Sequence, residues 1–150
     1  MKKAEVEAKT MNNLEIVKNF IKEFDHCVLA TVSPRNMPEC ALVEFAETSE
    51  LEIIFDTSTE YRKFINLERN QNVAFAIGSR DVNSAVQYEG VARRLEGGEL
   101  VKSKEIFFEK CPDARMWEKS PDTVYYKVKP RWLRYRSYAT EPMTEFEVNF

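Results

Sequence analysis

The sequence predicts a mainly β protein, a six-stranded antiparallel β-barrel with helices packed outside it, and three observations support this fold. Short stretches rich in Val, Ile and Phe alternate with turns that are too short for parallel crossovers. Three other segments have the apolar spacing of amphipathic helices. Finally, 150 residues with 43% hydrophobic side chains are enough for a single domain with its own core, and no linker or internal repeat divides the chain.

The first helix is predicted within residues 1–25, where apolar side chains recur every three or four positions: Leu14, Val17, Phe20, Ile21 and Phe24. Asn12 and Glu15 have the spacing of a capping box near its start. The remaining predicted elements are strands at 27–32, 38–46 and 51–55, a short helix between 57 and about 70, strands at 72–77 and 84–95, a helix at 99–110, a strand at 124–138 and a C-terminal tail at 139–150.

Two of the predicted strands have unusual apolar patterns. In the second strand, residues 41–43 (Ala-Leu-Val) leave neither face polar, which predicts a barrel wall that also meets a partner. In the last strand the apolar positions change from even to odd, which predicts one extra residue, a β-bulge, at Pro130 or Arg131. With that bulge, four basic side chains fall on the outward face: Lys127, Lys129, Arg134 and Arg136.

Composition excludes several common functional sites. The four glycines do not form a dinucleotide-binding or P-loop motif, and His26, the only histidine, excludes a zinc site built from several histidines. We predict no metal site. The three cysteines form no C-x-x-C motif, and no export signal or membrane-spanning run is visible, so reduced thiols and a cytoplasmic protein are predicted. A net charge of −3 argues against general nucleic-acid binding.

Residues 57–63 (Thr-Ser-Thr-Glu-Tyr-Arg-Lys) lie at a predicted strand-to-helix junction. Unpaired backbone N–H groups and the positive end of the helix dipole attract anions to such a junction. Thr57 and Glu60 have capping-box spacing, so the simpler interpretation is that hydroxyl residues only start a helix. Arg62 and Lys63 favour a phosphate site instead, because the dipole disfavours cations in a first turn by up to about 1 kcal/mol and a bound phosphate would reverse that effect.

Three stretches, taken in order, extend this interpretation: residues 51–63 (LEIIFDTSTEYRK), residues 86–92 (VQYEGVA) and residues 124–130 (VYYKVKP). The first, with Asn66-Leu67, Asn70 and Val73-Ala74 after it, looks like a strand–helix–strand core. Together the three resemble the pyridoxamine 5′-phosphate oxidase-like FMN-binding split β-barrel family. The resemblance covers about residues 27–138, which is most of the chain.

The resemblance implies a homodimer that holds two FMN molecules at its interface, each in contact with both subunits. The FMN-binding residues that it implies are Thr57, Ser58, Arg62, Lys63 and Gln87. In this set the two hydroxyl residues line the phosphate and ribityl end, the two basic residues neutralise the phosphate, and the glutamine is a further polar contact. The apolar residues 41–43 would then be covered by the partner or by the flavin ring.

Two departures from the family's vitamin-converting oxidases narrow the implied activity. Residues 40–45 lack the extra basic residue that those oxidases carry on this strand. Residues 141–150 contain neither the Arg nor the His that binds their substrate. The resemblance therefore implies a smaller flavoprotein oxidoreductase with an unidentified substrate. No catalytic side chain is predicted, because a flavin itself transfers the hydride.

Two other functions remain open from the sequence. One is a protein of the same fold that binds FMN, haem or a deazaflavin without turnover. The other is a barrel that contacts nucleic acid or protein through the four basic side chains of the last strand. Among single residues, His26 is interpreted as a partly exposed residue at a helix end, and Cys27 and Cys40 as small core residues.

Overall fold

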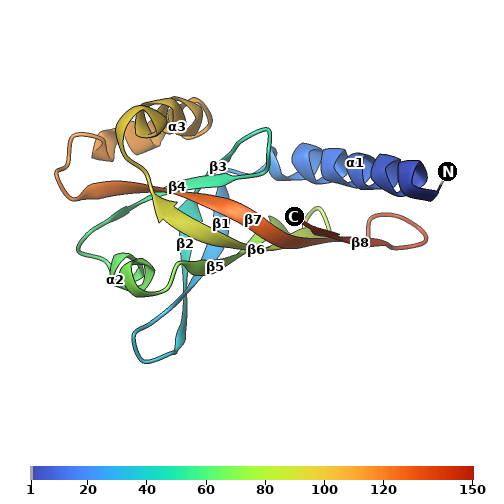
Figure 1. Ribbon diagram of the computed structural model, residues 1–150, viewed down its shortest axis with the longest axis horizontal. Helices are drawn as coiled ribbons and strands as arrows, with labels where there is room; N and C mark the ends of the chain where they lie inside the picture. Colours follow the sequence, from blue (N-terminus) through green and yellow to red (C-terminus); the bar gives the residue numbers. More distant parts are fainter. Residues whose placement is uncertain (1) are drawn as a thin grey trace.

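One continuous antiparallel sheet forms the centre of the structure, a computed structural model that describes residues 2–150 (Figure 1). Its strands are β1 (His26–Val32), β2 (Pro38–Glu44), β3 (Ala46–Glu47), β4 (Ile53–Ser58), β5 (Asn72–Ser79), β6 (Ser84–Arg94), β7 (Thr123–Ser137) and β8 (Thr144–Asn149). The strand order is β2-β1-β5-β6-β7-β4-β3, and β8 pairs with β7. The sheet curls so that β2 and β4 approach each other without pairing, as in a split barrel. This confirms the predicted fold class.

Helices cover both sides of the curled sheet. They are α1 (Lys2–Ile21), α2 (Arg62–Arg69) and α3 (Gly97–Lys110), and a 3₁₀ segment, η1 (Pro112–Trp117), follows α3. Figure 1 shows α1 and α3 along the upper side and α2 at the lower left, beside β2 and β5. No helix among residues 2–150 is both long enough and apolar enough to span a membrane.

Two apolar cores stabilise this arrangement. The larger core fills the barrel around Phe55, Phe75 and Tyr88, and Val17 and Ile21 of α1 pack onto it. A smaller core lies under α3, where Phe107 and Phe108 meet Ile54 and Tyr125 on the outer face of the sheet. Successive residues of β4 therefore contribute to different cores, which explains why Ile53, Ile54 and Phe55 are all buried.

The predicted bulge in the last strand is present. Glu89 of β6 pairs with Trp132 and Gly90 pairs with Pro130, which leaves Arg131 of β7 without a partner in β6. Gly90 is required at this point because a Cβ atom there would lie only 2.5 Å from the Lys129 carbonyl oxygen and 2.6 Å from Val128 Cγ1. The bulge places the basic residues on either side of it on one face of β7.

Some predicted element boundaries are wrong. The barrel has eight strands rather than six, because residues 46–47 form a separate short strand and residues 144–149, predicted to lie in a tail, form β8. The first helix is continuous from residue 2, so Asn12 and Glu15 do not cap its start. The helix predicted at residues 99–110 begins two residues earlier, because Gly97 and Gly98 form the start of α3.

Candidate functional site

The candidate site lies where β2, the end of β4 and the start of α2 meet. β4 continues as a strand through Thr57 and Ser58, because these residues pair with Val124 and Thr123 of β7. The helix therefore starts at Arg62, and Tyr61, at its N-cap position, makes no side-chain cap. The predicted capping box of Thr57 and Glu60 is wrong. We call residues 56–63 the β4–α2 junction.

Two buried polar atoms of the junction have no hydrogen-bond partner among the described residues. Thr57 is only 6% exposed, and its Oγ1 is unpartnered. The Oδ2 atom of Asp56 is also buried and unpartnered. Burial, followed by the nearby Glu44 carboxylate, raises the pKa of Asp56 to about 6. Buried polar groups normally have partners, so this junction has capacity to bind something further.

The two basic residues of the junction differ in their surroundings. The Arg62 side chain is 78% exposed, and its Nη1 lies 3.3 Å from Glu39 Oε1. Lys63 forms no salt bridge with any carboxylate among the described residues, and its Nζ lies 4.9 Å from the centre of the Tyr61 ring. Partial burial lowers the pKa of Lys63, while Asp56 opposes this shift. Lys63 is therefore the half-buried cation that an anionic group can neutralise.

Two cavities open along the junction and share Tyr61 and Lys63. The smaller cavity, of about 230 Å³, lies between β2 and the start of α2, beside Glu39, Cys40 and Arg62. The larger, of about 500 Å³, includes Thr57 and Ser58 together with the apolar side chains of Leu42, Val43 and Trp117. Leu42 is 70% exposed and Trp117 is 55% exposed. An elongated ligand with a flat apolar end and an anionic end matches this pair of cavities.

The structure brings together four of the five predicted FMN-binding residues. Thr57, Ser58, Arg62 and Lys63 all line these two cavities. Gln87 does not, because it lies in β6 on the outward face of the sheet, in one cross-strand row with Ala76, Val28 and Leu42. Three strand spacings, about 14 Å, separate Gln87 from Leu42 along this row.

The sequence of the chain matches the model of the pyridoxamine 5′-phosphate oxidase family over residues 14–137. The chain belongs to this family. No curated protein matches it in sequence.

Solved structures with the same fold come from several bacteria. The heme binding protein from Mycobacterium smegmatis has 19% sequence identity and a TM-score of 0.73; the match covers 85% of this chain and 55% of that protein. The heme storage protein HutZ from Vibrio cholerae has 20% identity and a TM-score of 0.69, over 78% of this chain and 89% of its own. General Stress Protein 26 from Bacillus anthracis has 20% identity and a TM-score of 0.70, over 91% of this chain and 98% of its own. These similarities establish the fold.

In this member of the family, a second basic region lies along β7, and most of its charge is neutralised. We call it the charged ladder; it comprises Lys127, Arg134 and Arg136 with Glu52, Glu99, Glu145 and Glu147. Lys127 Nζ lies 3.1 Å from Glu99 Oε1, Arg134 Nε donates to Glu147 Oε1 at 2.9 Å, and Arg136 pairs with Glu145.

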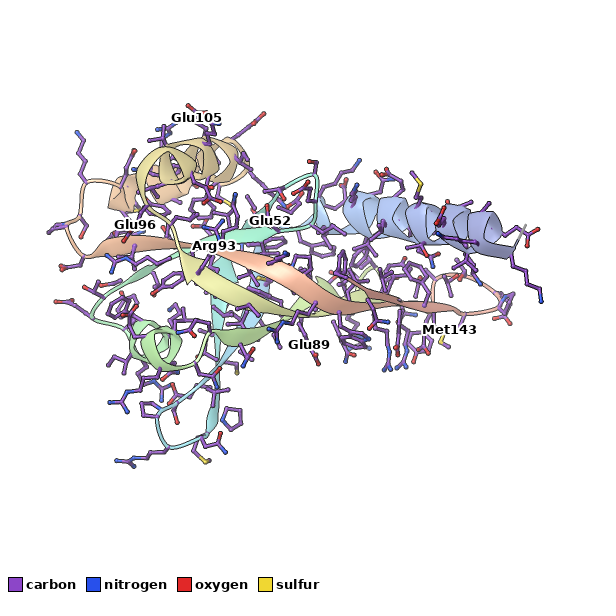
Figure 2. All side chains as sticks on the ribbon, in the orientation of Figure 1. Glu52, Glu89, Arg93, Glu96, Glu105 and Met143 are labelled. Carbon is purple, nitrogen blue, oxygen red and sulfur yellow. The ribbon has the colours of Figure 1, made fainter. Side chains whose placement is uncertain are left out.

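Figure 2 shows Glu52 and Arg93 between the sheet and α3, where Arg93 also pairs with Glu99. Of the four basic residues predicted on the outward face of β7, only Lys129 forms no salt bridge with a carboxylate among the described residues. The ladder therefore offers little unneutralised positive charge to a nucleic acid.

Two residues that line the site, Glu39 and Asp56, were not predicted from the sequence. Glu39 pairs with Thr31 on the inward face of β2, so a charged residue at an inward strand position is the signal that was available. Asp56 carried no such signal, because it lies on the outer face of β4 opposite Tyr125, where a charged residue is ordinarily exposed. Cys40, predicted to be a core residue, is exposed instead, since it lies on the outward face beside Leu42.

Proposed function

We propose that the protein is a small flavoprotein that binds FMN at the β4–α2 junction and acts as an oxidoreductase. One observation carries this proposal: the buried, unpartnered Thr57 Oγ1 and the unneutralised Lys63 ammonium line cavities whose other walls include exposed apolar side chains. Family membership supports the proposal. The residues present fit the chemistry of FMN, which combines a flat aromatic ring with a phosphate.

The residues would divide the cofactor between the two cavities. Lys63 and Arg62 would face the phosphate in the smaller cavity, and the hydroxyls of Thr57 and Ser58, in the larger cavity, would face the ribityl chain between phosphate and ring. Leu42, Val43 and Trp117 would cover the ring and exclude water from it. When bound, FMN supplies a ring that accepts or donates a hydride, and the protein supplies position and hydrogen bonds.

We propose further that the functional form is a homodimer. The outward face of β1 and β2 exposes Val28 and Leu42 in adjacent cross-strand positions, and the neighbouring residues of β5 on this face are alanines, Ala74 and Ala76. Such a face is apolar enough to bind a second copy of the chain. In a dimer, Gln87 of the partner subunit could reach the cofactor, which explains how a residue about 14 Å from Leu42 within one chain would still contribute.

The test is reconstitution of the purified protein with FMN, followed by absorbance, quenching of flavin fluorescence and sedimentation. We expect a yellow dimer, and Lys63→Ala should weaken FMN binding by at least about tenfold because a charge-assisted contact is lost. Thr57→Val should weaken binding by about fivefold without lowering stability, because it removes a hydroxyl that has no partner among the described residues. Lys129→Ala is the matched control, since Lys129 is exposed on β7.

A protein that fails to take up FMN would overturn the proposal. Equal loss of affinity in the Lys63 and Lys129 variants would mean that the phosphate lies elsewhere. For the oxidoreductase activity, NADH or NADPH should bleach the absorbance of the bound FMN; if neither does, a binding protein without turnover is the better interpretation.

A second candidate function, haem binding, is favoured by His26. This residue lines the larger cavity, and its Nδ1 lies 2.7 Å from Asp25 Oδ1. When Nδ1 donates to the carboxylate, Nε2 is free to ligate a metal, and carboxylate-oriented histidines are common metal ligands. Two of the similar structures are named as heme-binding or heme-storage proteins. A Soret band that appears with haemin and is lost in His26→Ala would support this function over FMN.

A further inference from the structure

The chain places a carboxylate of its own beside the start of α2. Glu39 of β2 accepts a hydrogen bond from Arg62 Nη1 at 3.3 Å through Oε1 and one from Asn66 Nδ2 at 2.9 Å through Oε2. Asn66 is 2% exposed, and its Nδ2 also lies 2.9 Å from Thr31 Oγ1. The Glu39 side chain is only 21% exposed. Glu39 is therefore held firmly against α2 by a buried amide.

This contact affects the anion-binding capacity of the junction. Arg62 is one of the two cations expected to neutralise a phosphate, and Glu39 already neutralises it. A dianionic phosphate entering the smaller cavity would meet the Glu39 carboxylate, which lines the same cavity. Like charges at such short range repel strongly when water is partly excluded. Glu39 cannot easily turn away, because Asn66 fixes it from behind.

We infer that Glu39 determines how strongly this site distinguishes phosphorylated from unphosphorylated ligands. Its carboxylate competes with the ligand's phosphate for Arg62, so the site discriminates less between FMN and riboflavin than a site without this carboxylate. The inference rests on the proposed FMN site. It concerns only the phosphate, because Glu39 does not line the larger cavity that would hold the ring.

The test compares the dissociation constants of FMN and riboflavin for the full-length protein and for Glu39→Gln. The glutamine keeps an oxygen that can accept from Asn66 and removes only the charge. We expect the ratio of the riboflavin constant to the FMN constant to rise about tenfold, equivalent to ~1.4 kcal/mol, through tighter FMN binding. Riboflavin binding should stay within about twofold of the wild-type value, because riboflavin has no phosphate for Glu39 to repel.

Glu68→Gln is the matched control, because it removes the same charge from an exposed position of α2, about 9 Å along the helix from Arg62. It should leave the ratio unchanged. Adding Arg62→Ala to Glu39→Gln should cancel the gain, since the competition acts through Arg62. Inorganic phosphate provides a readout without flavin: it should raise Tm more in Glu39→Gln than in the wild type.

The outcomes separate this inference from the proposed function. If the wild type binds both flavins and Glu39→Gln leaves their ratio unchanged, the inference is wrong and the FMN site stands. If neither the wild type nor the variant binds either flavin, both are rejected. If FMN binds only after the substitution, the inference is supported, because Glu39 alone excludes the phosphate, and the proposed FMN function of the wild type is rejected.

Discussion

The charged ladder and the β4–α2 junction both present basic side chains, but these charges are neutralised to different extents. In the ladder each basic group faces a carboxylate from a neighbouring strand or from α3, as Arg134 does with Glu147. In the junction, Lys63 lacks a salt bridge, and the buried Thr57 Oγ1 lacks a hydrogen bond among the described residues. The basic groups of the ladder are neutralised by carboxylates of the same chain, whereas the junction keeps polar groups that a ligand can bind. Basic composition alone does not distinguish a structural surface from a binding site.

The largest expected effect concerns the bulge that sets the register of the ladder. Gly90→Ala should destabilise the protein by about 3 kcal/mol, because the new Cβ would collide with the backbone of β7 and force Lys129 and its neighbours to move. Urea denaturation measures this effect. Gly98→Ala is the control, since nothing lies within 4 Å of a Cβ added there. Equal stabilities of the two variants would show that the bulge tolerates a side chain.

A smaller effect concerns Asp56 in the junction. Because the pKa of Asp56 is about 6 in the folded protein, above its ordinary value of 3.8, the folded state binds this proton more tightly than the unfolded state. The free energy of unfolding should therefore fall as pH rises from about 4 to about 6. Above about pH 6 the contribution of Asp56 should no longer change with pH. Asp56→Asn should be more stable than the wild type by about 1–2 kcal/mol at pH 7, with no advantage below about pH 4.

Thermal unfolding from pH 3.5 to 8 would measure the Asp56 effect. Glu44→Gln should move the pH window downward, because the Glu44 carboxylate contributes to the raised pKa of Asp56. Wild-type and Asp56→Asn curves that run parallel across this range would contradict the prediction.

The smallest expected effect on stability concerns a salt bridge of the charged ladder. Arg136 and Glu145 form an exposed pair between β7 and β8, so a double-mutant cycle with alanine should change Tm by less than about 2 °C at each step, and less at high salt. A large shift would mean that the pair anchors β8, and the distinction between the two regions would then need revision.

The sequence predicted most of the barrel but described its ends poorly. Alternation and turn residues located six of the strands, and the parity change in β7 predicted a bulge near Pro130 or Arg131, which the structure places at Arg131. The tail was misassigned because Thr144–Asn149 contains only two apolar side chains, Phe146 and Val148, and becomes a strand by pairing with the adjacent end of β7 in a hairpin. The capping box failed for the same reason, since pairing with β7 extends β4 through Ser58.

The sequence by itself determined the fold class, the family and the segment of residues 57–63 in which basic and hydroxyl side chains gather. Only the tertiary structure decided which of those groups have partners. It paired Arg62 with Glu39, left Lys63 half-buried without a salt bridge among the described residues, and placed Gln87 three strand spacings from Leu42. The physical reason is that residue spacing fixes local periodicity, whereas the neutralisation of a charge depends on strands and helices that meet only when the sheet curls.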